Sequence, residues 1–523
     1  MTSPPLGTAT RMGNNSVLEQ EVKLDAPIGL ALPDLRDLVG RTVRLPQERL
    51  ATTYYDTVDR RLWRQGLTLR HRLTGDGGEG MWTLKVPHAS DGQALERTEV
   101  SWNAPGSTVP AGATDVLRGV IRREPLRELV ELDTRRQRLV LRNDNDTAVA
   151  ELDDDLVHVV GGGHDGERFR QVELELLDDT WRSDEVLRRL EEAGARVQND
   201  PKLARAVDLP DRSPRPSSTI DRASSVADVV QASLQAGVSR LVAHDWRIRL
   251  AAADPGPEDV HQARVATRRL RSDLKTFGSV LDPVWVHHVR DDLKWVGTAL
   301  GDVRDADVLA DHLADAPLAL HERLATQRAA ACQRLAGVMA DNRYVDLLDK
   351  LHAGADRLPV GTAAAQVARQ RARRVVPGMV KPAWRGVRRQ VKKAGAHPTA
   401  AELHQVRIKS KQLRYAAELA TPVIGPPARR TASAAERVQT VLGDHHDAVA
   451  AEAWLRAELG QISPQETPAV SSTTATAAPP ATALEAGLLV AEARRRERKA
   501  RRQWKEAWKK LARPKRRRWL SHH

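Results

Sequence analysis

The chain has 523 residues, of which 82 are Lys or Arg and 69 are Asp or Glu, so its formal net charge is +13. A chain of this length can bury several cores, and its one cysteine, Cys332, excludes both an internal disulfide and a cysteine-rich zinc site. We see no signal peptide and no apolar run long enough for a bilayer, and we expect a cytoplasmic protein that does not contact a membrane.

The charge is distributed unevenly along the chain. Residues 1–210 carry a net −7 and residues 211–493 a net +7, while residues 494–518 hold 15 Lys or Arg against two Glu, a net +13. Together with the Pro/Gly-rich breaks, this predicts an α+β multidomain protein. We expect a disordered N-terminus at 1–15, a strand-rich domain at 16–208, a linker at 209–224, a helical domain at 225–460, a low-complexity linker at 461–482 and a basic, partly helical tail at 483–523.

The strand-rich region places charged residues on alternate positions. Glu19, Glu21 and Lys23 share one face of the first predicted strand, and Leu18, Val22 and Leu24 share the other. Short helices are predicted at 32–39, 114–122 and 183–193. A water-facing sheet explains any one such strand, but the charged faces of at least five strands combine paired acids with Arg and Lys. Acids two apart can hold Mg²⁺ or Mn²⁺, and Arg and Lys can bind phosphate oxygens.

In this order, these motifs resemble those of the CYTH domain, or triphosphate tunnel metalloenzyme, superfamily. The resemblance covers about residues 17–207 and rests on Glu19-x-Glu21-x-Lys23, Arg70-x-Arg72, Thr83-Leu84-Lys85, Arg97-x-Glu99, Glu173-x-Glu175 and Lys202. It implies an antiparallel barrel of about eight strands that forms a tunnel, and a divalent metal, Mg²⁺ or Mn²⁺. Members of the family hydrolyse triphosphate or thiamine triphosphate, or make cyclic AMP.

The resemblance also implies roles for individual residues. The implied metal-side acids are Glu19, Glu21, Glu99, Asp153, Asp155, Glu173 and Glu175, and the implied phosphate-binding residues are Arg70, Arg72, Lys85, Arg136 and Lys202. Lys23 would hold phosphate or help to activate the nucleophile, and with Glu19 and Glu21 it is a catalytic candidate. Which of Arg135, Arg136 and Arg138, and which of Asp153 and Asp155, faces the site stays open.

The helical region contains an internal repeat, at about 225–350 and 365–460. His261, Arg264, Arg268 and Arg271 align with His404, Arg407, Lys411 and Arg414 at an offset of 143, and the Gly-Asp motifs at Gly301 and Gly443 align at an offset of 142. Two motif pairs at almost one offset indicate a duplicated unit. The acids of the Gly-Asp motifs are interpreted as helix-boundary residues, with two alternatives: they orient neighbouring arginines, or they bind a metal with His445 and His446.

On a helix, each motif forms a narrow stripe of positive charge. At 100° per residue, His261, Arg264, Arg268, Arg271 and Lys275 fall within an arc of about 80°. A solvated face is the ordinary explanation, but such faces usually mix charge signs. Two stripes brought together would form a basic groove for a linear polyanion. The motifs resemble those of the CHAD domain, a conserved-histidine α-helical domain of two pseudo-symmetric bundles, which implies polyphosphate binding by His261, Arg264, Arg268, Arg271, Lys275, His404, Arg407, Lys411 and Arg414.

Three functions remain in competition. We expect a protein that binds polyphosphate through its helical domain and binds or hydrolyses a triphosphate-type substrate in the metal-dependent domain, as a metal-dependent phosphohydrolase. The alternative is a non-enzymatic polyphosphate-binding protein associated with polyphosphate granules. The third hypothesis is nucleic-acid binding by the tail, in which Trp504 and Trp508 stand among the basic residues.

Overall fold

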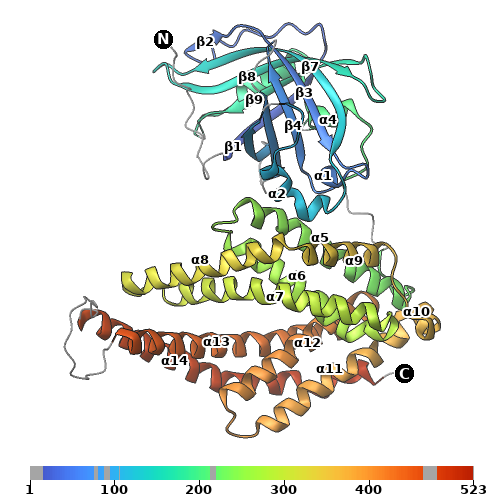
Figure 1. The fold of residues 1–523 in the computed structure, drawn as a ribbon, viewed down its shortest axis with the longest axis vertical. Helices are drawn as coiled ribbons and strands as arrows, with labels where there is room; N and C mark the ends of the chain where they lie inside the picture. Colours follow the sequence, from blue (N-terminus) through green and yellow to red (C-terminus); the bar gives the residue numbers. More distant parts are fainter. Residues whose placement is uncertain are drawn as a thin grey trace. The chain divides into compact units, whose positions relative to one another are not determined.

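The computed structural model describes residues 16–75, 80–87, 95–104, 106–178, 180–198, 200–212, 219–462 and 480–521. The chain divides into two compact units, Met1–Pro214 and Arg215–His523 (Figure 1). The segment at 1–15 and most of the low-complexity linker, where we expect disorder, lie outside the described residues. No helix of the described ranges is both long enough and apolar enough to cross a bilayer.

The first unit is built on one antiparallel sheet, which confirms the predicted fold class. Its strands are β1 (Ser16–Ala26), β2 (Arg41–Arg44), β3 (Glu48–Asp56), β4 (Thr68–Thr74), β5 (Met81–Pro87), β6 (Leu95–Asn103), β7 (Arg127–Arg142), β8 (Ala148–Val160), β9 (Arg168–Leu176) and β10 (Arg196–Val197). The strand order is β10-β1-β6-β5-β4-β3-β7-β8-β9, with β2 added on β7. The sheet has ten strands rather than about eight because β2 and β10 are short additions to the eight long ones.

Strand β1 pairs with two neighbours along its length. Ser16 to Glu21 pair with β6, and Glu21 to Ala26 pair with β9. Both ends of the strand order therefore meet β1, and Glu21 is the residue at which its pairing passes from one neighbour to the other. This places the acidic motif of β1 where both neighbouring strands can supply charged side chains.

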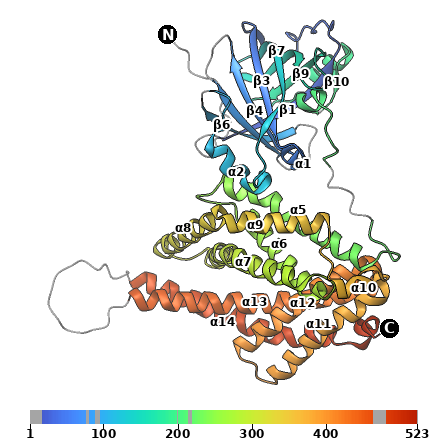
Figure 2. The same ribbon diagram turned by 45° about the vertical axis from the view of Figure 1, so that its right-hand side comes forward.

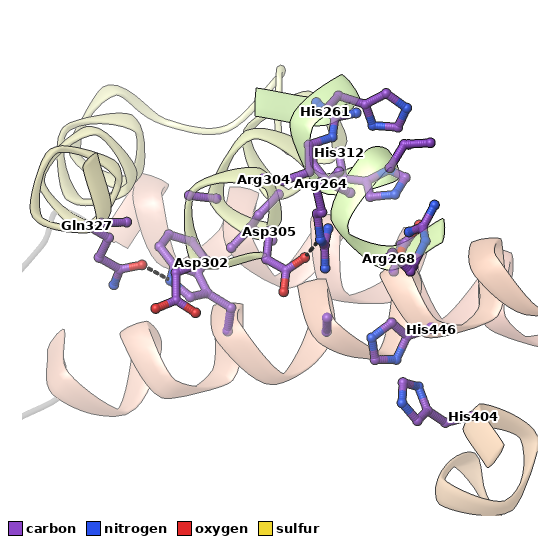
Figure 3. Close-up of a pocket in the computed structure, with 18 of the residues that line it drawn as sticks. His261, Arg264, Arg268, Asp302, Arg304, Asp305, His312, Gln327, His404 and His446 are labelled. Atoms are coloured by element: carbon purple, nitrogen blue, oxygen red, sulfur yellow. Dashed lines mark hydrogen bonds and ion pairs between the residues drawn. The ribbon is translucent and has the colours of Figure 1, made fainter. Parts of the chain in front are cut away.

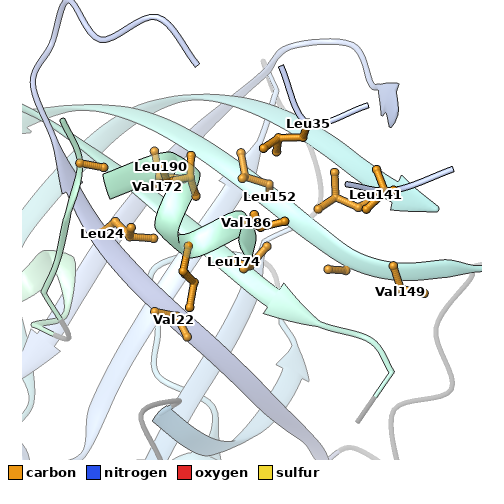
Figure 4. Close-up of a cluster of buried hydrophobic side chains, with 14 residues drawn as sticks. Val22, Leu24, Leu35, Leu141, Val149, Leu152, Val172, Leu174, Val186 and Leu190 are labelled. Atoms are coloured by element: carbon orange, nitrogen blue, oxygen red, sulfur yellow. The ribbon is translucent and has the colours of Figure 1, made fainter. Parts of the chain in front are cut away.

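A hydrophobic core covers the outer face of β1, β8 and β9 (Figure 4). Leu24, Leu152 and Val172 pack there against Leu190 of helix α3 (Asp184–Glu192). Helix α3 and helix α2 (Ala111–Ile121) confirm two of the three predicted short helices. The helix predicted at 32–39 is wrong: the segment contains turns instead. Its apolar residues Leu35 and Val39 are buried in the same core without helical structure.

The opposite face of the sheet is apolar at one end and charged along the rest. Leu132 and Val157 lie two positions from Thr134 and Asp155 on their strands, and the side chains of a strand alternate between faces. Phe169 and Leu203 pack with them, Leu203 from helix α4 (Lys202–Ala206). Since Lys202 begins the same helix, this packing fixes its ammonium group beside the charged residues. Helix α1 (Arg61–Arg64) contributes Trp63 to the cluster.

The second unit is all-helical, as predicted. Its helices are α5 (Val226–Leu250), α6 (Pro257–Phe277), α7 (Pro283–His312), α8 (Leu318–Ala340), α9 (Asn342–Asp356), α10 (Ala365–Arg369), α11 (Ala372–Ala394), α12 (Ala400–Ile424), α13 (Pro426–Ile462), α14 (Pro480–Leu511) and α15 (Pro514–Arg517). Capping boxes at Ser225 and Thr399 start α5 and α12, and prolines occupy the first turns of α6 and α7.

Helix α14, which contains most of the expected tail, packs along α13. Both views show the two helices side by side (Figures 1 and 2). They run antiparallel, since Glu452 pairs with Arg494 at 2.9 Å and the earlier residue His445 lies 3.4 Å from the later residue Glu497. Trp504 and Leu511 of α14 are buried, with exposed fractions of 3% and 0%. The basic C-terminal segment is thus part of the helical unit.

Candidate functional site

The strand register brings the predicted charged residues of the first unit onto one face. In each directly opposed pair of neighbouring strands, the two side chains point the same way. The opposed pairs are Glu21 with Glu175, Lys23 with Glu173, Lys85 with Glu99, Arg136 with Asp155, Arg138 with Asp153, and Asp153 with Glu173. We call the group formed by Glu21, Lys23, Arg70, Arg72, Lys85, Glu99, Arg136, Asp153, Asp155, Glu173 and Lys202 the sheet cluster.

Glu173 lies at the centre of the sheet cluster. It accepts from Lys23 and, at 2.7 Å, from Lys202, and Arg136 Nη2 lies 3.5 Å from its Oε2. Burial alone would raise the pKa of this carboxyl group, but Lys202, Lys23 and Arg136 hold its pKa well below the ordinary value. Glu173 is therefore ionised at neutral pH, and three cations from three different elements converge on it.

Arg136 resolves the register that the sequence left open. Its guanidinium donates to both oxygens of Asp155, at 2.8 and 2.7 Å, and it forms an ion pair with Asp153. Arg136 is buried and Arg135 is exposed, because they occupy opposite faces of β7. Asp153 and Asp155 both belong to the site, and Arg138 reaches Asp153 at 3.1 Å from the same face.

Arg72 is the cation of the sheet cluster with the least compensation. Its Nε donates to Thr52 Oγ1 at 3.3 Å, and no carboxylate of the described residues forms an ion pair with it. Burial, together with the nearby Arg70 and Arg136, lowers its pKa to about 10. Its neighbour Arg70 instead donates to Glu99 at 3.1 Å, and Lys85 also pairs with Glu99. Arg72 is thus positioned to receive an anion.

The acids of the sheet cluster are candidate metal ligands, and among its described residues Glu21 has a free, buried carboxylate oxygen. Glu21 is 5% exposed, and its Oε1 is buried without a hydrogen-bond partner, whereas its Oε2 accepts from Lys23 at 2.9 Å. An unpartnered carboxylate oxygen suits a hard cation. Among the described residues, however, no three His, Cys, Asp or Glu side chains are grouped closely enough to hold an ion. The side chain of Glu19 lies outside the described residues, and Glu175 is opposite Glu21 in the register.

In the second unit, the two histidine–arginine motifs line one pocket of about 950 Å³ (Figure 3). Helix α6 contributes His261, Arg264 and Arg268, and helix α12 contributes His404, Arg407 and Lys411. We call this pocket the groove. Arg268 Nε donates to Tyr415 Oη at 2.9 Å, which ties α6 of one repeat to α12 of the other. The duplicated stripes therefore meet in space, as the repeat predicts.

The remaining three predicted residues lie outside the groove lining. Arg271 and Lys275 continue along α6, where burial and Arg290 lower the pKa of Arg271, and burial and Lys409 lower that of Lys275. The buried Nε of Arg290 has no hydrogen-bond partner, and Arg271, Lys275, Arg290 and Lys409 form a positive group in which the charge of Asp291 partly offsets that of Arg290 at Arg271. Arg414, in contrast, pairs with Glu418 at 2.6 Å and with Glu436 at 3.0 Å, and its charge is satisfied within the protein.

Lys411 is the least compensated cation of the groove. It forms no hydrogen bond or ion pair with any described residue, and the buried Nε of Arg407 also lacks a partner. Burial, followed by the charges of Arg268, Arg407 and Arg264, lowers the pKa of Lys411 to about 6, against the opposing effect of Asp447. Positive groups held together at this cost in the absence of a ligand are typical of an anion-binding site.

Three histidines surround these cations and have lowered pKa values. Burial is the main cause for His261, His404 and His446, and neighbouring arginines add to it. The rings of His404 and His446 lie 4.5 Å apart. His445 points elsewhere and lies 3.4 Å from Glu497 of α14, so the two adjacent histidines serve different parts of the fold. The alternative of a metal site on His445 and His446 gains no support, since no metal-like cluster occurs in the described ranges.

The Gly-Asp motifs position the arginines of the groove. A Cβ added to Gly301 would lie 3.6 Å from Arg264 Nη2, and one added to Gly443 would lie 3.7 Å from Arg407 Nε. These are ordinary van der Waals distances, so each arginine lies directly against the helix backbone at the glycine of its own repeat, although an added methyl group would also fit. The interpretation of these acids as helix-boundary residues is wrong, because the two motifs lie inside α7 and α13. Asp305, in the first motif, pairs with Arg264 at 3.0 Å, which supports the alternative that these acids orient arginines.

Sequence reasoning missed the groove residues contributed by other helices. Arg304 and His312 come from α7, Gln327 and Arg334 from α8, and Gln439 and Trp454 from α13. Trp454 donates to Gln327 at 2.9 Å across the groove wall (Figure 3). At none of these positions do the two repeats carry the same type of side chain, so the repeat gave no signal for them. The Gly-Asp motifs were the only repeated feature that pointed to α7 and α13.

The CYTH domain family matches residues 18–206, and the CHAD domain family matches residues 232–456. The chain belongs to the family of proteins in which a CYTH domain precedes a CHAD domain. The uncharacterized protein Rv2226 of Mycobacterium tuberculosis is 30% identical over 475 residues, which cover 83% of this chain and 87% of that protein.

Solved structures are similar to each unit separately. The CHAD domain of the plant Ricinus communis is 22% identical and covers 58% of this chain and 96% of its own, with a TM-score of 0.42. A putative adenylate cyclase of Bacillus halodurans is 18% identical and covers 37% of this chain and 98% of its own, with a TM-score of 0.27.

Replacing Lys411 with Met should stabilise the ligand-free protein. The folded pKa of about 6 lies below the ordinary value of 10.5, so the unfolded state binds more protons between these values and stability rises with pH there. Replacing Lys411 with Met removes the free-energy cost of burying its charged ammonium group. This cost is largest at pH values below the folded pKa and disappears as pH rises toward the unfolded pKa. We expect the free energy of unfolding at pH 6 to increase by at least about 1 kcal/mol, which corresponds to a rise of roughly 2–4 °C in Tm. Thermal unfolding at several pH values measures it, and an equal or lower Tm at pH 6 would contradict the buried cation.

Proposed function

We propose that the helical unit binds inorganic polyphosphate in the groove. The observation that carries this proposal is the convergence of Arg264, Arg268, Arg407 and Lys411 from two repeats, with Lys411 and the Nε of Arg407 left unpaired. Charge-assisted hydrogen bonds to phosphate contribute about 1.5–3 kcal/mol each, so four such cations can give tight binding.

The distribution of cations favours a chain over a single phosphate ion. The groove takes similar residues from both repeats, and the group of Arg271, Lys275, Arg290 and Lys409 continues the positive charge along α6. A linear polyanion can contact both groups at once, whereas a monophosphate can occupy only one of them. A protein with this property would associate with polyphosphate granules.

For the first unit, we propose binding and hydrolysis of a triphosphate-type substrate with a divalent metal, Mg²⁺ or Mn²⁺. Arg72, the least compensated cation of the sheet cluster, supports phosphate binding, together with Arg70, Lys85, Arg136 and Lys202. Glu21 with its unpartnered oxygen, Glu19, Glu173 and Glu175 would hold the metal, with Glu99, Asp153 and Asp155 as further acids. Such a metal supplies a Lewis acid for phosphate oxygens and an activated water. Lys23, held between Glu21 and Glu173, would orient these acids or hold a phosphate oxygen.

The experiment that tests both proposals uses the full chain. Affinity for long polyphosphate is measured over a salt series, and phosphate release from triphosphate, thiamine triphosphate, nucleoside triphosphates and long polyphosphate is measured with and without Mg²⁺ or Mn²⁺. We expect salt-sensitive polyphosphate binding and metal-dependent turnover of one of these substrates. Binding without any turnover would exclude the phosphohydrolase, and turnover without polyphosphate binding would exclude the groove.

A non-enzymatic polyphosphate-binding protein is the second candidate. The observation that favours it is that Glu99, Asp155 and Glu173 each pair with two or more cations of the sheet cluster. Within the described residues, this arrangement neutralises acids that a metal would need. In this candidate, the first unit holds a phosphate chain end without cleaving it. The absence of turnover in the experiment above would select it.

Polyphosphate binding in the groove should be coupled to proton uptake. A bound polyanion raises the lowered pKa values of Lys411, His261, His404 and His446, so binding favours their protonated forms. Affinity should therefore fall as pH rises above about 6, by up to about tenfold per pH unit for each proton taken up. Calorimetry in buffers of different ionisation enthalpy measures the protons directly. Equal affinity and no proton uptake between pH 6 and pH 8 would contradict the groove as the binding site.

A further inference from the structure

Helix α14 lies beyond the matched CHAD domain and has two opposite faces. Its buried face consists of Ala486, Ala493, Ala500, Trp504, Ala507 and Leu511, which pack within the helical unit. At 100° per residue, Arg495, Arg498, Lys499 and Arg502 fall within an arc of about 100° on the other side of the helix. We call these four residues the α14 stripe. Together with Gln503 they line a surface hollow of about 640 Å³.

Three of the four cations of the α14 stripe have no ion pair with the described residues, whereas several other cations of the helix do. Arg494 pairs with Glu452 at 2.9 Å, and Arg501 with Glu497 at 2.6 Å. Arg498, Lys499 and Arg502 form no hydrogen bond or ion pair with any described residue, and Arg495 has only the pair with Glu492 at 2.6 Å. The four cations make four like-charge pairs at i,i+3 or i,i+4 spacing, which cost about 0.2–0.5 kcal/mol each. A solvated helix face would normally relieve this repulsion with interspersed acids.

The α14 stripe lies next to the groove. Arg496, the residue after Arg495, is 3.2 Å from Nδ1 of His312, and His312 lines the groove. Lys499 also interacts with Asp444 of the second Gly-Asp motif. Positive charge therefore continues from the groove, past the end of α7, onto a helix that the family match does not include.

The aromatic residues of α14 indicate which polyanion this surface fits. Trp504 is 3% exposed, and Trp508 stacks on Trp384 of α11 with ring centroids 5.7 Å apart. The Trp504 ring is therefore buried, and one face of the partly buried Trp508 ring is covered by Trp384. Base stacking provides much of the affinity for single-stranded nucleic acid, so this arrangement favours a phosphate chain over nucleic acid. A phosphate chain without bases needs only cations.

We propose that the α14 stripe is a second phosphate-binding surface, on which a polyphosphate chain that leaves the groove continues. The inference rests on the proposed polyphosphate binding by the groove. It predicts that short and long chains bind the helical unit differently: a short oligophosphate occupies the groove alone, and a long chain also contacts α14. Because the first unit is proposed to bind triphosphate, the parent and every variant of the test also carry Arg72→Gln, which weakens that site equally in all of them.

The test compares three variants of the full chain. The stripe variant carries Arg495→Gln, Arg498→Gln, Lys499→Gln and Arg502→Gln, and the groove variant carries Arg264→Gln, Arg407→Gln and Lys411→Gln. A charge control carries Arg44→Gln, Arg64→Gln, Arg135→Gln and Arg168→Gln, four exposed cations of the first unit. Affinities for a short oligophosphate, for long polyphosphate and for single-stranded DNA are measured over a salt series.

The stripe variant should bind the short chain as tightly as the parent, and its affinity for the long chain should be lower by at least about tenfold. The slope of log affinity against log salt concentration for the long chain should become less steep by about two to four units. The charge control should bind both chains like the parent. A stripe variant that binds long polyphosphate like the parent would refute the second surface. If single-stranded DNA binds more tightly than polyphosphate and only the stripe variant loses it, the surface serves nucleic acid and the proposal is wrong. Failure of the groove variant to lose the short chain would instead refute the groove, so the two failures are distinguishable.

Discussion

Neutralising the groove should abolish polyphosphate binding. Replacing Arg264, Arg268, Arg407 and Lys411 with Gln removes four cations that no described group fully compensates, apart from the pair between Arg264 and Asp305. At about 1.5–3 kcal/mol for each charge-assisted contact, we expect affinity to fall at least about 1,000-fold. Fluorescence anisotropy with labelled polyphosphate measures this loss.

Two controls separate this effect from unfolding and from net charge. The first control replaces four exposed cations of the first unit with Gln, namely Arg44, Arg64, Arg135 and Arg168. It removes the same number of Lys or Arg residues as the groove substitutions and should bind polyphosphate like the parent. The four-residue variant loses the buried Lys411, which favours stability, but also the bond from Arg268 to Tyr415, so its folding is checked by thermal unfolding. A folded four-residue variant that retains the parent affinity would place polyphosphate elsewhere.

Replacing Glu21 with Gln should abolish metal-dependent turnover of the triphosphate-type substrate. The change keeps the size of the side chain but removes the charge of a carboxylate whose Oε1 is buried and unpartnered. We expect phosphate release to fall at least about 100-fold, because metal binding and water activation depend on this charge. The double variant Glu19→Ala, Glu21→Ala should show no release at all.

A matched control for this variant is Glu131→Gln on the outer face of β7, where the glutamate is exposed. It should release phosphate like the parent. Arg72→Gln provides the complementary result: it removes a phosphate-binding cation without touching an acid, so substrate affinity should fall while metal binding persists. Parent-like phosphate release by the Glu21→Gln variant would remove this carboxylate from the proposed metal site.

The features that could be predicted from the sequence are periodic or repeated. Alternation on β1 placed Glu21 and Lys23 on one face, and two motifs at a common offset predicted that α6 and α12 form equivalent stripes. These signals are local, since a side chain's face is set by the geometry of its own strand or helix. These patterns predicted which residues lie on the same face, but not which ion pairs and hydrogen bonds they form.

The features that escaped prediction depend on contacts between distant segments. The sequence could not assign Arg135 or Arg136 to the site, because one residue of register decides it, and the pairing of β7 with β8 sets that register. The segment at 32–39 has a helix-like apolar pattern, yet Leu35 is buried through packing against β8 and β9 rather than through helix formation. Trp504 was expected on a basic tail and is instead buried on the packed face of α14.

The bond between Arg268 and Tyr415 and the 3.0 Å pair between Arg269 and Glu418 join the two repeats across the groove. Each repeat on its own presents only part of the Lys and Arg side chains that line the groove: the first contributes Arg264, Arg268, Arg304 and Arg334, and the second contributes Arg407 and Lys411. The segment that was duplicated could have formed such a groove only as two copies bound face to face. In a single chain the two copies are always present in equal number and are free to differ, and they do differ: Glu418 stands where the first repeat has Lys275.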